Sequence, residues 1–437
     1  MHARLFRAAF ASLSLIAVFF SPPLLAETPH PVDRAKAARL LEQARQTCLA
    51  DDGALWGLQF CGPTLLIDPE TRRALKADLT AIQPITEDGL EDVQWPDNMR
   101  LSNSTRYWNG VQYATLTWPV QARSEPGRVA LVLHENYHRT QGVMHFRVGE
   151  DVRSEHLDSE SGRVSLRLEA RALEKAVSAE DLETRRHFAR LALAFRHDRL
   201  GGRPVARQSE RYLTLFEGLA EYSGNRLARS PSAFREYAAH RPTGIEGHSS
   251  FTRNFAYFTA PAWGWLLDQT GPDWRRSLTG EDGLADHYAR RIGAQAPFAD
   301  DAARQQGLAA LDGATVKAEE RQRASRIQAR QQRYRDRFVD GPVLVMEANG
   351  FSMDPRTVTS LGQHGRVYEV LSISNDWGRF ETENGALMGP RPPYVYAEAV
   401  TDESGALVLN NDQWTLSLKP GWTIVPHEKG FAIARQD

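Results

Sequence analysis

The spacing of apolar residues changes twice along this chain of 437 residues. The short runs "LWGLQF", "TLLIDP" and "VQYATLTWPV", the last preceded by the turn Asn109-Gly110, indicate strands in residues 47–122. From Gly127 to about Arg335 the apolar residues recur at helical spacing, and past Asp340 short strand-like runs return. We therefore predict an α+β fold, with strand-rich parts at both ends and helices between them.

The first 26 residues read as a secretory signal peptide. Arg4 and Arg7 precede an apolar run from Ala8 to Phe20, and Ala26 supplies a small residue at a cleavage position. The apolar run is shorter than the roughly 20 residues that a membrane span needs, and two prolines interrupt it. We expect cleavage, no stable membrane span in the mature protein, and a periplasmic or secreted location.

These patterns predict four parts of the chain. The signal peptide occupies residues 1–26 and a strand-rich region, opening with a helix in "VDRAKAARLLEQARQ", occupies residues 27–122. A mainly helical domain follows in residues 123–338 and a small β-domain in residues 339–437.

Two cysteines, Cys48 and Cys61, flank "LADDGALWGLQF". In an oxidising compartment such a pair predicts a local disulfide, which stabilises the fold by about 3 kcal/mol at most because the loop is short. A role as metal ligands is the weaker alternative, since no CxxC pattern accompanies them.

The charge balance gives no electrostatic reason to expect nucleic-acid binding. The formal charge is −2, and loss of Arg4 and Arg7 with the signal peptide changes it to −4. The one basic stretch, residues 317–337, contains interspersed Glu and Asp and is typical of a solvated helix. The sequence does not indicate an oligomeric state.

The stretch "ALVLHENYHRTQ" contains the pattern His-Glu-x-x-His at His134, Glu135 and His138. Residues four apart share a helix face, so the two imidazoles can bind one Zn²⁺ while Glu135 takes a proton from a water on it. The alternative is a chance match on an ordinary helix. The apolar run "VALVL" before the motif favours a buried helix, but a third ligand is needed.

Glu217 in "LFEGLAEYSG" is the preferred third ligand, because the small Gly218 and Ala220 permit close helix packing. Glu169 in "LRLEARALEKA" is the competing candidate. A helix-surface carboxylate near Arg167 and Arg171 is its plainer interpretation. His156 or Asp158 in "EHLD" remain further alternatives, since zinc accepts nitrogen and oxygen ligands alike.

Four other side chains are candidates for supporting roles. Glu221 lies one helical turn after Glu217 and either orients a ligand, binds a substrate amine or is solvated. Tyr257 and Arg253 are candidates for stabilising a developing oxyanion, and His248 is a weaker candidate for the same role. An aromatic-rich helix is more often part of a core, which is the competing interpretation of Tyr257.

His134-Glu135-x-x-His138 followed by Glu217-Gly218-Leu219-Ala220-Glu221-Tyr222 resembles the gluzincin branch of zinc metallopeptidases. The resemblance implies a zincin-like helical catalytic block, Zn²⁺ as cofactor, and the ligand and base roles given above. It also implies an oxyanion role for a Tyr or His. Segments within residues 50–275 are similar to exported bacterial proteins grouped as peptidases by motif alone.

One departure from the gluzincin pattern keeps Glu169 open as the ligand. The 78 residues between His138 and Glu217 exceed the usual gluzincin separation, and two inserted helices are expected there. The stretch around Glu169 resembles the Glu-x-x-Ala helix of small gluzincin-like domains.

We expect an exported zinc metallopeptidase acting on a peptide or protein. The alternatives are an envelope binding or assembly protein on a peptidase scaffold, and a metal-dependent hydrolase of a non-peptide amide.

Overall fold

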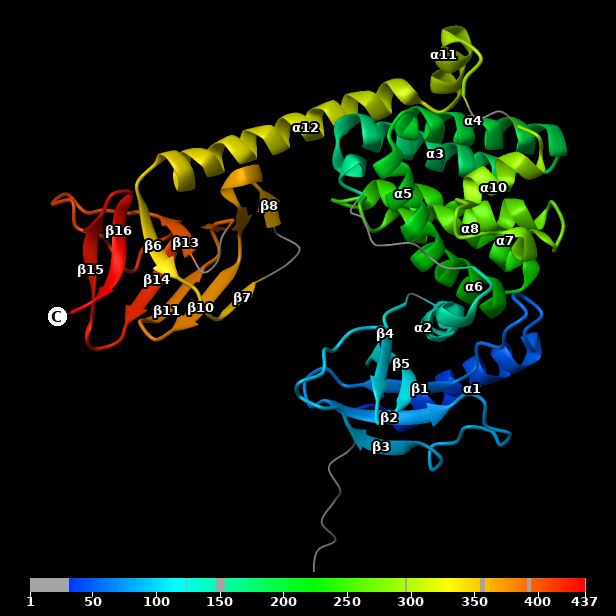
Figure 1. Cartoon of the computed structure of the whole chain (residues 1–437), viewed down its shortest axis with the longest axis horizontal. Helices are drawn as coiled ribbons and strands as arrows, with labels where there is room; N and C mark the ends of the chain where they lie inside the picture. The colour runs from blue at the N-terminus through cyan, green and yellow to red at the C-terminus, as the bar shows by residue number, and fades with distance from the viewer. Residues whose placement is uncertain are drawn as a thin grey trace, which may run out of the picture. The chain divides into compact units, whose positions relative to one another are not determined.

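The computed structural model describes residues 31–122, 124–146, 154–294, 297–353, 358–390 and 394–436. The predicted signal peptide, residues 1–26, lies outside them. The described residues form twelve α-helices and three β-sheets, with strands toward both ends of the chain (Figure 1), which confirms the α+β class. The chain divides into two compact units, one of Met1–His145 with Ser223–Ser230 and one of Phe146–Tyr222 with Pro231–Asp437.

The first unit contains a five-stranded sheet in the order β3-β2-β1-β5-β4. Its strands are β1 (Pro63–Ile67), β2 (Arg73–Asp78), β3 (Glu91–Gln94), β4 (Ser104–Trp108) and β5 (Val111–Thr117). Leu66 and Leu116 share a core with helices α1 (Arg34–Asp51) and α2 (Glu125–Thr140). Leu65 and Ile67 belong to a second core with Trp95, as the alternation of side chains along a strand requires.

The predicted tight turn at Asn109-Gly110 is confirmed. Both residues have positive φ, 49° and 77°, and the turn joins β4 to β5 with Trp108 opposite Val111. This turn suits a hairpin because its twist matches that of the flanking strands.

The predicted strand "LWGLQF" is wrong, and the predicted disulfide is confirmed. Residues 52–60 form turns instead, since Asp52, Gly53 and Gly57 all have positive φ and the backbone cannot extend. Cys48 and Cys61 close this segment, with Cα atoms 5.6 Å apart.

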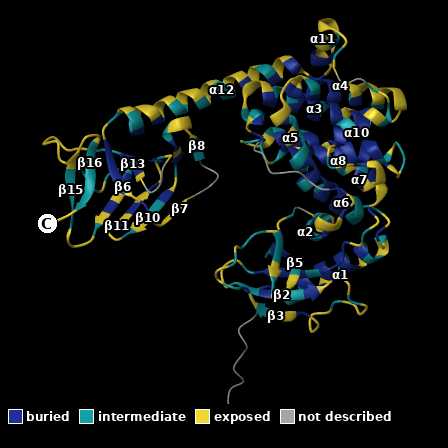
Figure 2. Cartoon of the chain, viewed as in Figure 1, coloured by how far each residue is buried: buried dark blue, intermediate teal, exposed yellow. Residues whose placement is uncertain are grey.

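The second unit contains most of the helices. Helix α4 (Leu182–Leu200) ends directly before Gly201-Gly202, and Gly202 has positive φ. Helix α8 (Phe255–Asp268) is buried along almost its whole length (Figure 2). The others are α3 (Glu160–Ser178), α5 (Pro204–Leu213), α7 (Pro231–His240), α9 (Trp274–Ser277), α10 (Leu284–Arg291), α11 (Asp301–Ala310) and α12 (Gly313–Arg335), with α6 (Leu219–Ala228) contributing to both units.

Two sheets make up the predicted C-terminal β-region. Their orders are β14-β11-β10-β7 and β15-β16-β6-β13-β12-β9-β8. The strands are β6 (Val343–Glu347), β7 (Phe351–Met353), β8 (Val358–Ser360), β9 (Arg366–Tyr368), β10 (Leu371–Asn375), β11 (Gly378–Thr382), β12 (Ala386–Met388), β13 (Tyr394–Glu398), β14 (Trp414–Leu418), β15 (Trp422–His427) and β16 (Gly430–Arg435). Side chains from both sheets, Leu344 and Phe380 among them, form one core. One of the short strand-like runs past Asp340, "GALVLN", forms no strand and takes part in isolated bridges such as Thr401 with Leu407.

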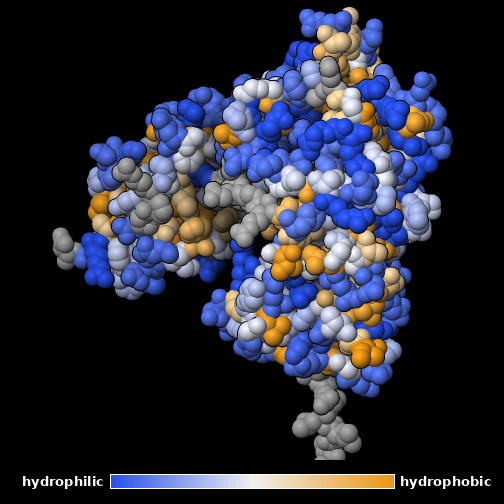
Figure 3. Space-filling view, turned by 45° about the vertical axis from the view of Figure 1, so that its right-hand side comes forward, coloured by the Kyte–Doolittle hydropathy of each residue, from blue (hydrophilic) through white to orange (hydrophobic). Residues whose placement is uncertain are grey.

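The visible surface in Figure 3 is mainly hydrophilic, with apolar residues in small separate patches. The charged helix predicted within residues 317–337 is the exposed middle and end of α12, yellow along much of its length in Figure 2. Within the described residues, we find no helix long and apolar enough to cross a membrane.

Candidate metal centre

Helix α2 carries the His-Glu-x-x-His motif. The helix begins after Ser124, whose side-chain oxygen accepts a hydrogen bond from the Gly127 amide at 3.2 Å. This is the usual cap for a helix start, and the proline in the first turn is compatible with it because that turn has no intrahelical partner for its amide. Most of α2 from Val129 to Tyr137 is buried, with Leu131 half-buried, so His134 and Glu135 lie on a buried stretch and His138 at its edge.

Residues within and directly after the motif anchor α2 to its surroundings. Asn136 donates a hydrogen bond from Nδ2 to Thr64 Oγ1 in β1, at 3.1 Å. Arg139 donates from Nε to the Gln112 carbonyl in β5, at 3.0 Å. The Tyr137 ring lies edge-on to the ring of Phe60, with centroids 5.2 Å apart, and burial raises the pKa of its phenol. These contacts fix the rotation of α2 about its axis.

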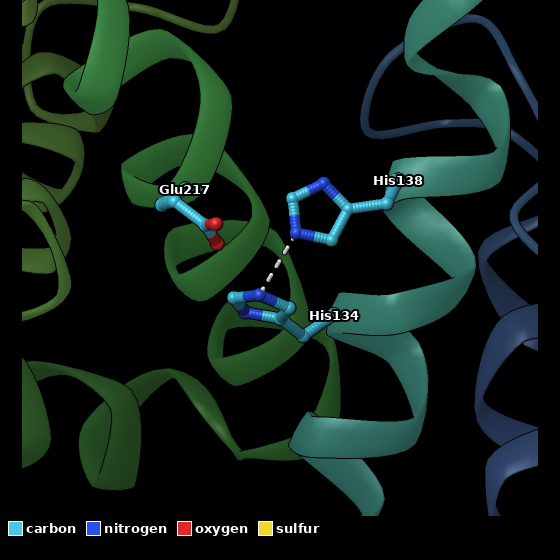
Figure 4. Close-up of side chains that lie close together, drawn as sticks. All are labelled: His134, His138 and Glu217. Carbon is cyan, nitrogen blue, oxygen red and sulfur yellow. Dashed lines mark hydrogen bonds between the residues drawn. The ribbon is translucent and has the colours of Figure 1, made fainter. Parts of the chain in front are cut away.

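With that rotation set, His134 and His138 point toward one another (Figure 4), and their Nε2 atoms are 3.1 Å apart. Two imidazole nitrogens on one tetrahedral zinc, each at about 2.0–2.1 Å from it, lie about 3.3–3.4 Å apart. The observed separation is therefore close to what a shared ion requires.

Gln141 contacts the ring nitrogen of His138 that faces away from His134. Its side-chain oxygen lies 2.8 Å from His138 Nδ1. An amide oxygen only accepts hydrogen bonds, so this contact favours the tautomer with the hydrogen on Nδ1, which leaves Nε2 available to a metal. Partners of this kind orient histidine ligands in metal sites. Sequence reasoning missed Gln141, although its position three residues after His138 on a helix was a readable signal.

Glu217 completes the group. Ligand atoms of His134, His138 and Glu217 all lie within 4.8 Å of one another, and Figure 4 shows Glu217 reaching toward the two rings from a neighbouring helix. Glu217 lies in the π-helical turn η3 (Thr214–Gly218), which joins α5 to α6 without a break. Single π-turns inside α-helices often occur at functional sites.

Close packing of α6 on α2 accounts for the approach of the Glu217 helix. A Cβ atom added at Gly224 would lie 2.3 Å from the Ala130 carbonyl oxygen and 3.1 Å from the His134 amide nitrogen. The two helices are thus in backbone contact at the turn that bears His134. Glu217 precedes Gly224 by about two helical turns, so both residues face the same way.

Helix α8 supports the π-turn. A Cβ at Gly218 would lie 2.7 Å from that of Ala260, and a Cβ at Gly264 would lie 2.2 Å from the ring of Tyr222. Small residues at four-residue spacing on α8 therefore let η3 and α6 pack closely on it. The predicted packing role of Gly218 is confirmed, and α8 is its partner.

The site is largely shielded from water. His134 and Glu135 are 3% and 4% exposed, Glu217 is 9% exposed, and His138 is half-buried. Two imidazoles and a carboxylate are the donors that zinc binds in catalytic sites of three protein ligands, so these residues fit a zinc ion.

Glu169 lies in a different environment. Its carboxylate is fully buried, accepts a hydrogen bond from Trp263 Nε1 at 3.0 Å and pairs with Arg199 Nη2 at 2.5 Å. Both oxygens are engaged, which suits a structural ion pair.

His156 and Asp158, the other alternative ligands, also have structural partners. His156 Nε2 lies 2.8 Å from Glu210 Oε1. Asp158 accepts hydrogen bonds from the Ser250 hydroxyl and the Phe251 amide, both at 2.7 Å.

The residues proposed for supporting roles lie on separate elements. Glu221 accepts a hydrogen bond from the Tyr237 hydroxyl, which gives it a packed rather than solvated setting. Tyr257 is half-buried on α8, Arg253 is exposed in the turn before that helix, and His248 is exposed beside Phe258. The oxyanion roles of Tyr257 and Arg253 stay predictions.

Comparison with known proteins found no matching family model, curated protein or solved structure. The chemical interpretation therefore depends on the residues and their geometry.

Proposed function

We propose that this protein is an exported zinc-dependent peptidase in which His134, His138 and Glu217 hold the metal and Glu135 is the general base. The observation that supports it best is the grouping of a carboxylate with both motif imidazoles within 4.8 Å. The presence of Glu135 favours a catalytic site, because a purely structural zinc site needs ligands but no base. The zincin-like character of the helical domain belongs to this proposal.

The chain's own residues have distinct tasks in the proposed reaction. A bound zinc ion lowers the pKa of its water toward about 7 and polarises the substrate carbonyl. Glu135 accepts the proton of the attacking water and passes it to the leaving amine, as a positioned carboxylate does in general acid–base catalysis. His134, His138 and Glu217 keep the reacting groups in one geometry, and Tyr257 or Arg253 donates to the developing oxyanion.

Replacing Glu135 by Gln tests the assignment of the base. The amide has nearly the same shape but cannot take a proton, so we expect about one zinc per chain to be retained while hydrolysis of casein or fluorogenic peptides falls by about 10²–10⁴-fold. Metal content is measured by elemental analysis. Full turnover with zinc still bound contradicts the role of Glu135.

Glu125→Gln is the matched control. Glu125 begins the same helix, is exposed and bonds to the Gln43 side chain. The same chemical change there leaves both zinc content and hydrolysis unchanged.

A further inference from the structure

The loop closed by Cys48 and Cys61 contacts two helices of the first unit. One is α2, which carries His134 and His138, and the other is α6, which continues from the turn that carries Glu217. The loop lies more than seventy residues before the motif in sequence, and the proposed reaction assigns it no task.

On α2, the loop surrounds Tyr137. The rings of Trp56 and Phe60 lie edge-on to the Tyr137 ring, with centroids 6.2 Å and 5.2 Å away. All three side chains are buried. Tyr137 directly precedes His138, so its packing sets where the ligand-bearing turn of α2 lies.

The closing cysteine takes part in the same contact. The Cys61 carbonyl accepts a hydrogen bond from Arg139 Nη1 at 3.5 Å. The Arg139 guanidinium also packs directly on Gly62, where an added Cβ would lie 1.9 Å from Nη1. Tyr137 and Arg139, the two neighbours of His138 in sequence, therefore both contact this end of the loop.

On α6, the loop provides a directed hydrogen bond. Trp56 Nε1 donates to Ser223 Oγ at 2.9 Å, and both groups are buried. Ser223 adjoins Gly224, where α6 is in backbone contact with α2. One side chain, Trp56, thus contacts both helices beside the point where they cross.

The loop depends on its covalent closure. It contains neither helix nor strand between Asp52 and Phe60, and its own hydrogen bonds are short-range, such as Gly57 amide to Gly53 carbonyl at 2.7 Å. The disulfide ties Cys61 to the end of α1, and a crosslink of this kind limits the conformations open to the segment. Without it, ordering Trp56 and Phe60 against Tyr137 costs conformational entropy.

We infer that the Cys48–Cys61 loop is a redox-sensitive clamp on the metal centre, with Trp56 as its positioning residue. The inference rests on the proposed function, which supplies the metal. A dithiol reductant supplies two electrons and two protons, which convert the Cys48–Cys61 disulfide into two thiols. The reductant itself is oxidised to a disulfide. The reduced loop holds α2 and α6 less firmly, and metal affinity falls.

The test compares zinc affinity of the oxidised wild type with that of C48A/C61A, by competition with a fluorescent chelator. A variant avoids thiol reductants, which bind zinc themselves. We expect the dissociation constant to rise by about 10–100-fold, the effect typical of losing outer contacts that orient ligands. Far-UV circular dichroism checks that the variant is folded.

W56F tests the clamp with the disulfide intact. Phenylalanine keeps an aromatic ring but cannot donate a hydrogen bond to Ser223 Oγ, so we expect the zinc dissociation constant to rise. S223A removes the acceptor of the same hydrogen bond, and we expect it to raise the constant as well. Trp422→Phe, on β15 of the C-terminal sheets, is the matched control and leaves zinc affinity unchanged.

An unchanged dissociation constant in folded C48A/C61A overturns the clamp and leaves the proposed function intact. If the double variant does not fold, an unchanged constant in W56F overturns it instead. A wild-type protein that binds no zinc overturns the proposed function and the clamp together.

Discussion

Glu210 on α5 is fully buried, and positively charged side chains surround its carboxylate. Arg199 Nε and Arg196 Nη1 lie 2.7 Å from its oxygens, and His156 Nε2 lies 2.8 Å away. Burial alone raises the pKa of a carboxyl group, but the two arginines outweigh it and hold the pKa of Glu210 well below its usual range. The carboxylate stays charged in the folded protein at pH values where it takes a proton in the unfolded chain.

This difference makes Glu210 a source of acid sensitivity. Its stabilising contribution is fully present above the unfolded pKa of about 4.3 and is lost as the pH falls toward the lower folded value. We predict that the free energy of unfolding in urea falls below about pH 4.5, with up to about 1.4 kcal/mol per pH unit from this group. E210Q removes the proton site, so its slope is shallower by that amount. Equal slopes in both proteins contradict the assignment.

Glu169 and Glu217 illustrate what sequence reasoning resolves at the residue scale. Both are carboxylates on helical segments after the motif, and the sequence pattern left both as candidates for the third metal ligand. Their difference depends on Arg199 and Trp263, which are 30 and 94 residues from Glu169 and occupy its oxygens. Partners so distant in sequence are set by tertiary packing, so composition and spacing could not separate the two carboxylates.

At the scale of elements, the crossing of α6 over α2 depends on Gly224. An added methyl group there meets the Ala130 carbonyl oxygen, which belongs to helix backbone and cannot turn aside. One helix has to move away from the other, and the Glu217 end of the helix moves with it.

We therefore predict that Gly224→Ala lowers the free energy of unfolding by about 1–3 kcal/mol, as overpacking of a close contact does, and weakens zinc binding. Gly247→Ala is the control, because an added Cβ there meets nothing within 4 Å. Chemical denaturation and a zinc titration of both variants measure the two effects. Equal zinc affinity in the two variants shows that this crossing does not set the ligand geometry.

Long periodic helices were predictable from sequence, and irregular elements were not. The helical apolar spacing from Gly127 to about Arg335 covers α3, α4 and the run from α5 through α6. The structure interrupts that last run with the π-turn η3, which leaves no mark on the apolar spacing. The apolar letters of "LWGLQF" suggested a strand, but positive φ at Gly53 and Gly57 and the disulfide bend that segment into turns.

At the scale of the whole chain, the candidate site combines residues with 78 others between them, from His138 to Glu217. Between His138 and Glu217, the described part of the chain forms three α-helices, α3, α4 and α5, where two inserted helices were expected. The motif alone identified the histidine pair and Glu135, because their spacing is local. The third group depends on where the chain returns after these helices, which local patterns do not specify.

Diffraction from crystals soaked in zinc tests the central proposal most directly, because anomalous scattering at the zinc edge locates the ion without assumptions about ligands. We predict one strong peak at about 2.0–2.2 Å from His134 Nε2, His138 Nε2 and a Glu217 carboxylate oxygen. A peak elsewhere, or histidine rings that point to separate environments with no zinc between them, contradicts the proposed metal centre.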